Sequence, residues 1–580
     1  MLRRSLLLAT SALIAAPILA HAQALSFAPV PFAADDAARR QVLASESVTL
    51  DGQVHAIGYH AFARSGDAHG DHRFGALVTR SGATITDAQG HPDLSSSADF
   101  TSLIQANGRL YSITHFENRP GAMYLSELAQ APDGTLTMIA TAPIDFSGLN
   151  GLWVPCAGSV TPWNTHLGSE EYPADARQIA EAQQLSDIDG YAFDMVRYEG
   201  IDPASLDLAT FRAAYRPYRY GSPIEVTIDE GGTATPVRHH AMGRIAVELA
   251  SVMPDQRTAY ISDDGSNVGL FRFVADRAGD LSAGQLYAAR WIQTSAEGAG
   301  AATLAWVDLG HADDASVRAA VEAGVGFDDL FDTAAMAEDG TCPAGFLASN
   351  AETRAECLRV RDGMDMLASR LETRRYASMM GATTEFRKME GITYNPEANT
   401  LYLAMSEVSK GMEDAASQDR GGRNDIRLEK NGCGAVYALT LDAGYVATAL
   451  TTLVAGIPAQ YGDDTPMAGN TCDIDAIANP DNLTYLPGHD TLIIGEDSGS
   501  GHRNDVIWSM NLTSGALTRI FSTPYGAETT SPYWYPDVGG HGYLMAVVQH
   551  PYGESDEDQL RDPAEARAYV GYIGPFPALN

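Results

Sequence analysis

The recurrence of short β-hairpins along most of the chain is the feature that most constrains its fold. An apolar strand ends in a turn rich in Asp, Gly or Asn, and a second strand with aromatic or β-branched residues follows, as at 399–409 and 434–444. These segments indicate β-structure. Hairpins repeated over several hundred residues favour a propeller over a sandwich, because each propeller blade is a small antiparallel sheet. We therefore predict an all-β fold, a β-propeller whose inner strands direct acidic residues toward a central axis.

Two stretches depart from this pattern and predict helices. Residues 173–220 contain ADARQIAEAQQL, and residues 312–380 contain ASVRAAVEAG and AECLRVRDGMDMLASRLETRRYA. We interpret both as insertions between blades that cap the propeller, rather than as catalytic elements. Because no Ser/Gly/Pro-rich or charged linker divides the chain, we expect residues 23–580 to form one domain with these insertions.

The first 22 residues have the pattern of an export signal. Arg3 and Arg4 precede an apolar run that ends in Ala20-His21-Ala22, a small-x-small cleavage site. The paired arginines resemble a twin-arginine signal, although ordinary secretion signals also contain Arg pairs. No later apolar stretch has the length needed to span a bilayer. We expect a periplasmic or secreted protein that contacts no membrane after cleavage.

The charge of the chain restricts its partners. Lys and Arg total 38 against 74 Asp and Glu, which gives a formal net charge of −36. This balance argues against a nucleic-acid partner. The acidic excess fits a solvated surface, and it also fits carboxylates gathered around calcium. We expect a monomer.

The number of cysteines bears on the role of Cys156. Of the five cysteines, four can pair in an oxidising compartment and one is left over. Pairing Cys342 with Cys357, and Cys433 with Cys472, would leave Cys156 as a free thiol. The connectivity is not fixed by the sequence.

Cys156 stands in the stretch 151–172, GLWVPCAGSVTPWNTHLGSEEY, together with the carboxylates Glu170 and Glu171. A thiolate is a soft ligand suited to iron, zinc or copper, whereas carboxylates suit hard cations such as calcium. We therefore consider Cys156, Glu170 and Glu171 candidate ligands of a mixed-metal site. The alternative is a buried structural Cys beside an exposed acidic turn.

Acidic residues recur where other predicted strands begin or end. The positions are Glu248, Asp263 with Asp264, Glu390, Asp481 with Asn482, Glu496 with Asp497, and Glu528, and His550 completes the set. A single loop carboxylate is usually a turn former or a solvated charge. Glu248 and Glu390 differ, because they lie between apolar neighbours, where an unpaired carboxylate costs several kcal/mol to bury. A metal ion or a strong hydrogen-bond partner would remove that cost.

Together these motifs resemble the PhoX-type alkaline phosphatase family of exported bacterial phosphatases. The resemblance runs from about residue 100 to residue 575, and it rests on CAGSVTPWNTHLGSEE, GRIAVE, YISDD, MEGITY, NPDN, GEDSG and QHP. It implies a six-bladed propeller that holds two Fe³⁺ ions and Ca²⁺ ions at its axis, with a Cys thiolate among the iron ligands. By the resemblance, the residues near the metals are Cys156, Glu171, Glu248, Asp264, Glu390, Asp481 and Asp497. The division between iron and calcium stays open.

A metal cluster of this kind predicts hydrolysis of small phosphate monoesters. Multivalent cations neutralise the phosphate oxygens, generate a nucleophile and stabilise the leaving alkoxide, so no serine nucleophile is required. The chain contains no G-x-S-x-G elbow and no H-E-x-x-H helix.

The chain also departs from the family pattern. Val247 replaces a family His, and Asp263-Asp264 replaces Glu-Asp. The family's Arg-Pro-Glu is Lys388-Met389-Glu390 here, and that arginine is understood to hold the substrate phosphate, whereas Lys acts only as a point charge. We name two candidate phosphate-contacting cations, Lys388 and Arg216. Arg387 would face the opposite side of its strand.

Two other functions remain open at this point. A calcium-only propeller hydrolase of lactones or phosphotriesters would need the carboxylates but no thiolate. A non-catalytic binding propeller would need only structural calcium.

Overall fold

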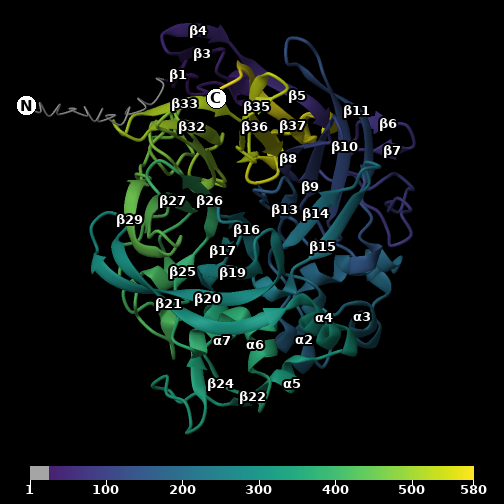
Figure 1. The fold of residues 1–580 in the computed structure, drawn as a ribbon, viewed down its shortest axis with the longest axis vertical. Helices are drawn as coiled ribbons and strands as arrows, with labels where there is room; N and C mark the ends of the chain where they lie inside the picture. Colours follow the sequence, from purple (N-terminus) through teal and green to yellow (C-terminus); the bar gives the residue numbers. More distant parts are fainter. Residues whose placement is uncertain (1–24, 580) are drawn as a thin grey trace, which may run out of the picture.

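The computed structural model describes residues 25–579, so the predicted signal peptide at 1–22 lies outside the described residues. Within residues 25–579, six four-stranded antiparallel units form a ring, around which the colour runs once from blue through green to yellow (Figure 1). We call these units the first to sixth blades, in chain order. The predicted propeller is confirmed.

The strands of the blades are as follows. The first blade contains β8 (Ala98–Ala106), β9 (Arg109–Phe116), β10 (Ala122–Gln130) and β11 (Leu136–Pro143), and the second contains β12 (Ser159–Val160), β13 (His166–Gly168), β14 (Ile224–Ile228) and β15 (Ala234–Arg238). The third contains β16 (Val247–Val252), β17 (Thr258–Asp263), β19 (Phe271–Arg277) and β20 (Asp280–Ser295), and the fourth contains β26 (Met389–Asn395), β27 (Thr400–Met405), β28 (Ala435–Leu441) and β29 (Ala447–Ala455). The fifth contains β30 (Pro480–Leu486), β31 (Thr491–Glu496), β32 (Val506–Asn511) and β33 (Leu517–Ser522), and the sixth contains β34 (Glu528–Thr530), β36 (His541–Gln549), β37 (Tyr569–Pro577) and β5 (Gly58–Arg64).

Neighbouring blades pack face to face, so their inner strands are buried on both sides. Every residue of β30 and of β31 is buried. Apolar side chains of the fourth blade, such as Tyr402 and Val436, share a core cluster with Leu483, Leu492 and Trp508 of the fifth. These inner strands therefore place apolar residues on both faces, because both faces exclude water.

Strands from the N-terminal part of the chain complete the last blades. β5 pairs with β37 of the sixth blade, and β2 (Leu43–Ala44) pairs with β33 of the fifth. Figure 1 accordingly shows the purple N-terminal segment beside the yellow C-terminal strands. This pairing closes the ring and protects strand edges that would otherwise be exposed.

The third and fourth blades are also joined through a long hairpin. β20 runs into β21 (Ala301–Asp313), which pairs with β29, so the two blades form one nine-stranded sheet. The short strands β18 (Ser266–Val268) and β25 (Phe386–Arg387) pair beside this junction. Near the long hairpin, β22 (Phe331–Ala334), β23 (Leu347–Ser349) and β24 (Glu356–Val360) form a small separate sheet.

Most helices lie in two stretches of the chain. The first holds α2 (Ala176–Glu181) and α3 (Leu208–Ala214), and the second holds α4 (Asp314–Ala323), α5 (Phe327–Leu330), α6 (Asp365–Leu371) and α7 (Thr373–Met379). They gather at one side of the ring, in the lower part of Figure 1. No helix within residues 25–579 is long and apolar enough to cross a membrane.

The disulfides follow the predicted pairing. Cys342 is bonded to Cys357 and Cys433 to Cys472, while Cys156 is a free thiol. The Cys433–Cys472 bond ties a loop of the fourth blade to the segment that precedes the fifth.

Candidate metal centre

A cavity of about 350 Å³ lies where the six blades meet. Its lining residues are Ser97, Glu117, Cys156, Glu171, Tyr172, Glu248, Asp264, Lys388, Glu390, Asp481, Asp497, Glu528, Gln549, His550 and Glu554. Each blade, or a loop next to it, contributes at least one of them. Nine of these side chains are carboxylates, so the cavity gathers far more negative charge than Lys388 and His550 can offset.

A repeated β-bulge brings an acid to the cavity from each of four blades; three of these acids line it, and Asp99 lies beside the lining residues Glu117 and Cys156. In the first, third, fourth and fifth blades, the pairing of the first strand with the second shifts register directly after the opening residue. The residue at the shift is acidic in every case, namely Asp99, Glu248, Glu390 and Asp481. A bulge bends the strand and re-aims the unpaired side chain, which here turns toward the axis. These four acids are buried.

Acid pairs at the end of the second strand divide between two environments. They are Glu170-Glu171, Asp263-Asp264 and Glu496-Asp497. Successive residues of an extended chain point to opposite faces, so only the second member of each pair lines the cavity. The first member is buried in the blade and binds a basic side chain, which is Arg238, Arg374 or His502 respectively.

The candidate ligand Glu170 therefore does not reach the cavity. Its Oε1 accepts hydrogen bonds from Arg238 (2.6 Å) and from the backbone N–H of Trp153 (3.1 Å). Its Oε2 accepts from Arg238 (2.9 Å) and from the N–H of Gly221 (2.9 Å). Both oxygens are occupied, so Glu170 is a structural acid that fixes the loop carrying Glu171.

This difference predicts opposite effects for two neighbouring substitutions. Glu170→Gln leaves Arg238 buried without a counter-charge, so we expect it to lower the free energy of unfolding by about 3–5 kcal/mol. Glu171→Gln removes a charge that Glu248 and Asp264 repel, so the metal-free protein should keep or gain stability while losing metal. Urea unfolding and metal analysis of both variants measure this. Loss of metal from the Glu170 variant at unchanged stability would contradict the assignment.

The two predicted phosphate-contacting cations lie in different places. Lys388 Nζ lies in the cavity, 3.2 Å from Glu390 Oε1, 3.6 Å from Asp264 Oδ2 and 3.7 Å from Asp497 Oδ2. Arg216 does not: it lines a separate, largely apolar pocket near α4, and its Nη1 is 3.5 Å from the carbonyl oxygen of Glu322. The prediction for Arg216 fails because its segment, AAYRPYRYG at 213–221, packs among the helices α2, α3 and α4.

A third cation, which the sequence reasoning missed, stands beside the cavity-lining residue Glu117. Arg119 follows the lining residue Glu117 by two positions, and its guanidinium lies 4.7 Å from the ring centroid of Tyr191 and 5.5 Å from that of Trp153. The indole N–H of Trp153 donates to the backbone oxygen of Glu171 (2.7 Å). Arg119 makes no hydrogen bond or ion pair with any residue in 25–579, and its Nε is buried without a partner.

Sequence reasoning also missed Asp99, Glu117 and Tyr172. Asp99 and Glu117 were detectable in principle, because they occupy in the first blade the positions that Glu248 and Asp264 occupy in the third. The hydroxyl of Tyr172 donates to Asp264. Tyr172, Lys388 and His550 share a left-handed backbone, with φ of 44°, 42° and 31°, a conformation that costs energy in residues other than Gly and clusters at functional sites.

The loop that carries Cys156 is held by two buried histidines. His115 Nδ1 donates to the carbonyl oxygen of Cys156, His166 Nε2 lies 2.7 Å from His115 Nε2, and Ser102 Oγ lies 2.8 Å from His166 Nδ1. Burial lowers the pKa of His115 to about 4. Two neutral rings satisfy all three contacts. Ser102 Oγ donates to His166 Nδ1, His166 Nε2 donates to His115 Nε2, and His115 Nδ1 donates to the carbonyl oxygen of Cys156. The chain from Ser102 to Cys156 therefore fixes the thiol without adding charge.

Burial and mutual repulsion raise the pKa of most acids in the cavity. Burial and Glu117 raise the pKa of Asp99 to about 7, and burial with Asp264 raises that of Glu390 to about 7. Burial, Asp99 and Glu248 raise the pKa of the Cys156 thiol. The ionised cluster is therefore unfavourable unless cations bind to it.

The side chains fit metal ions in three adjoining groups. Ligand atoms lie within 4.8 Å of one another in the groups Asp99, Glu117 and Cys156; Cys156, Glu171 and Glu248; and Glu248, Glu390 and Asp481. Neighbouring groups share Cys156 or Glu248. Asp99 Oδ2 and Glu248 Oε1 are buried without a hydrogen-bond partner among the described residues. Such oxygens are costly unless a cation takes them as ligands.

Fold and site together define a propeller whose axial cavity gathers a thiol and carboxylates in groups that could hold metal ions. The family model described as alkaline phosphatase PhoX matches residues 119–552. The chain belongs to the PhoX alkaline phosphatase family, as its motifs predicted, and it is a metal-dependent phosphatase.

Among solved structures, one with a TM-score above 0.5 supports the fold, and two others are more distant. Pseudomonas fluorescens PhoX in complex with vanadate, a transition state analogue, is 18% identical, with 96% of this chain and 98% of that chain covered and a TM-score of 0.61. A putative 6-phosphogluconolactonase from Bacteroides uniformis is 13% identical over 75% of this chain and 90% of that one, with a TM-score of 0.29. A mutant Trypanosoma rangeli sialidase is 7% identical over 89% and 58%, with a TM-score of 0.30. No curated protein sequence matches the chain.

Proposed function

We propose that the chain hydrolyses small phosphate monoesters in the axial cavity with the help of iron and calcium. The observation that carries this proposal is the convergence of one thiol and nine carboxylates on a single buried space. When bound, such cations neutralise phosphate oxygens, activate a nucleophile and stabilise the leaving alkoxide. A calcium-only lactonase or phosphotriesterase would give no role to Cys156, which belongs to two of the three ligand groups.

The ligand types suggest how the metals divide. The two groups that contain Cys156 combine a soft thiolate with carboxylates and suit Fe³⁺, whereas the group of Glu248, Glu390 and Asp481 offers only oxygen and suits Ca²⁺. Asp264 and Asp497 line the cavity beside Lys388, where they can complete the coordination or hold Lys388 in place. Glu528 and Glu554 also line the cavity and add to its negative charge.

The chain's own cations hold and orient the substrate phosphate. Lys388 is half-buried and faces the cavity, so it can donate to a phosphate oxygen once cations share the neighbouring carboxylates. Arg119 replaces Arg216 as the second candidate, because its buried Nε has no hydrogen-bond partner among the described residues. A planar guanidinium offers two parallel donors to a phosphate, which an ammonium cannot.

We expect removal of calcium to abolish activity reversibly. Oxygen ligands exchange Ca²⁺ readily, whereas iron bound by a thiolate leaves slowly, so EGTA should strip calcium first. Hydrolysis of p-nitrophenyl phosphate should fall to background after EGTA treatment and return when calcium is added, at constant iron content. Full activity after exhaustive EGTA treatment would remove calcium from the proposal.

The location and assembly of the protein also remain part of the proposal. The export signal at 1–22, whether of the twin-arginine or the ordinary type, would place the protein in the periplasm or outside the cell. The two disulfides suit such an oxidising compartment. A monomer remains our expectation, and light scattering of the purified protein tests it.

A further inference from the structure

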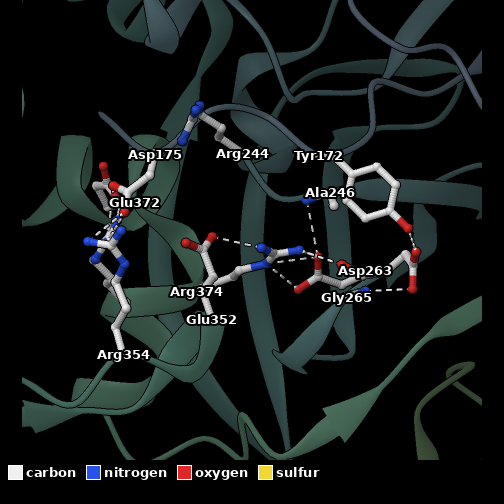
Figure 2. Close-up of polar contacts among 12 residues, drawn as sticks. Tyr172, Asp175, Arg244, Ala246, Asp263, Gly265, Glu352, Arg354, Glu372 and Arg374 are labelled. Atoms are coloured by element: carbon white, nitrogen blue, oxygen red, sulfur yellow. Dashed lines mark hydrogen bonds and ion pairs between the residues drawn. The ribbon is translucent and has the colours of Figure 1, made fainter. Parts of the chain in front are cut away.

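One residue of the helical stretch 312–380 contacts the turn that carries the cavity-lining residue Asp264. Arg374, on α7, donates to both carboxylate oxygens of Asp263, at 3.0 and 2.9 Å from its Nε, and its Nη2 donates to the carbonyl oxygen of Asp264 at 2.7 Å. Its Nη1 donates to Glu352 at 2.7 Å on the opposite side. Figure 2 shows the guanidinium between Glu352 and Asp263. The guanidinium of Arg374 is thus held by Asp263 and the Asp264 carbonyl on one side and by Glu352 on the other.

The turn that Arg374 holds carries two parts of the candidate metal centre. The side chain of Asp264 lines the cavity and accepts a hydrogen bond from the hydroxyl of Tyr172. The carbonyl oxygen of Gly265 accepts from the backbone N–H of Lys388 at 2.8 Å. A shift of residues 263–265 would therefore move both Asp264 and Lys388.

Asp263 links Arg374 to the rest of the turn through further hydrogen bonds. It is fully buried, and besides Arg374 it accepts from the N–H groups of Ala246 and Gly269, each at 3.1 Å. The N–H of Asp264 in turn donates to the carbonyl oxygen of Ala246 at 3.0 Å. In the second and fifth blades the corresponding acids, Glu170 and Glu496, bind Arg238 of the same blade and His502 of a nearby loop. In the third blade the partner comes from a helix more than 100 residues further along the chain.

We propose that Arg374 is a positioning residue for the metal centre, which holds Asp264 and the backbone of Lys388 in place through the turn 263–265. The proposal rests on the proposed function, and it gives the helical stretch a role beyond covering the propeller. Partners that orient metal ligands typically change metal affinity by about 10- to 100-fold when removed.

Arg374→Lys tests this role with little disturbance of charge. A single ammonium keeps a positive charge beside Asp263, but it cannot bond both Asp263 oxygens, the Asp264 carbonyl and Glu352 together. Tb³⁺ replaces Ca²⁺ at oxygen ligands and luminesces when nearby aromatic side chains are excited. A Tb³⁺ titration therefore measures metal binding in the cavity independently of catalytic activity. We expect the Kd for Tb³⁺ to rise by roughly 10-fold or more, and kcat on p-nitrophenyl phosphate to fall.

Arg375→Lys is the matched control. Arg375 is the next residue on α7, is also buried, and binds Glu372 and Glu356 (both 2.7 Å) and Asp175 (3.1 Å), none of which lies in the turn. A purely structural role predicts that the two variants lose stability alike and share one Tb³⁺ affinity. Positioning predicts that only the Arg374 variant binds Tb³⁺ more weakly.

A second variant keeps the proposal testable if Arg374→Lys does not fold. Asp263→Asn preserves the shape of the side chain and leaves Arg374 its bonds to Glu352 and the Asp264 carbonyl, so Tb³⁺ affinity should fall by a smaller factor. Wild-type Tb³⁺ affinity in the Arg374 and Asp263 variants, or equal weakening by Arg375→Lys, would overturn the proposal. Wild-type protein that binds Tb³⁺ but hydrolyses no phosphate ester would instead count against the proposed function alone.

Discussion

Cys156→Ser is expected to lose iron and to lower kcat/KM on p-nitrophenyl phosphate by on the order of 10³-fold, about 4 kcal/mol. Cys156 is the only thiol in the cavity and belongs to two of the three ligand groups. A serine hydroxyl is a harder and far less acidic ligand, so it cannot replace the thiolate for iron. The fold should survive, because the loop is held by its backbone bonds to His115 and Ser169.

The control for this variant is removal of the Cys342–Cys357 bond by two serine substitutions. No residue between Cys342 and Cys357 lines the cavity, so loss of this bond should lower stability by about 2–4 kcal/mol without changing iron content. Iron content by mass spectrometry and circular dichroism of both proteins are the measurements. A Cys156→Ser protein with full iron and full turnover would show that the thiol is structural.

Lys388→Ala is expected to raise KM and lower kcat together, with a loss of about 2–3 kcal/mol in kcat/KM if a charged hydrogen bond to the transferring phosphate is removed. Lys388→Arg should strengthen substrate binding, because it supplies the two parallel donors of the family's arginine. Steady-state kinetics on p-nitrophenyl phosphate measure both effects.

Arg119→Ala and Arg216→Ala accompany the Lys388 variants. Arg216 lies outside the cavity, so its variant should retain wild-type kinetics. Near-wild-type kcat/KM for Lys388→Ala beside a large loss for Arg119→Ala would transfer the phosphate contact to Arg119. In that case Lys388 serves only to offset the charges of Asp264, Glu390 and Asp497.

The propeller and the free thiol could be predicted from local patterns. The hairpins repeat with a regular pattern of apolar strand, polar turn and second strand. Five cysteines leave at least one without an intramolecular partner whatever the connectivity. Glu248 and Glu390 could be recognised because each interrupts an apolar strand, and the structure explains this by a bulge that turns the acid out of the blade and into the cavity.

Other features depend on contacts that no local pattern carries. Glu170 and Glu171 look equivalent in sequence, yet strand alternation sends one to Arg238 and the other to the cavity. The role of Arg374 requires α7 to pack against a turn more than 100 residues earlier in the chain. Arg216 resembled an active-site arginine only because the packing of its helical segment was unknown.

Anomalous diffraction at the iron absorption edge, from crystals of the correctly exported protein, tests the central claim most directly. We predict an iron peak within bonding distance of Cys156 Sγ, flanked by carboxylates of the groups that share this thiol. An iron peak elsewhere, or a cavity that holds no iron in an active enzyme, would contradict the proposed metal centre.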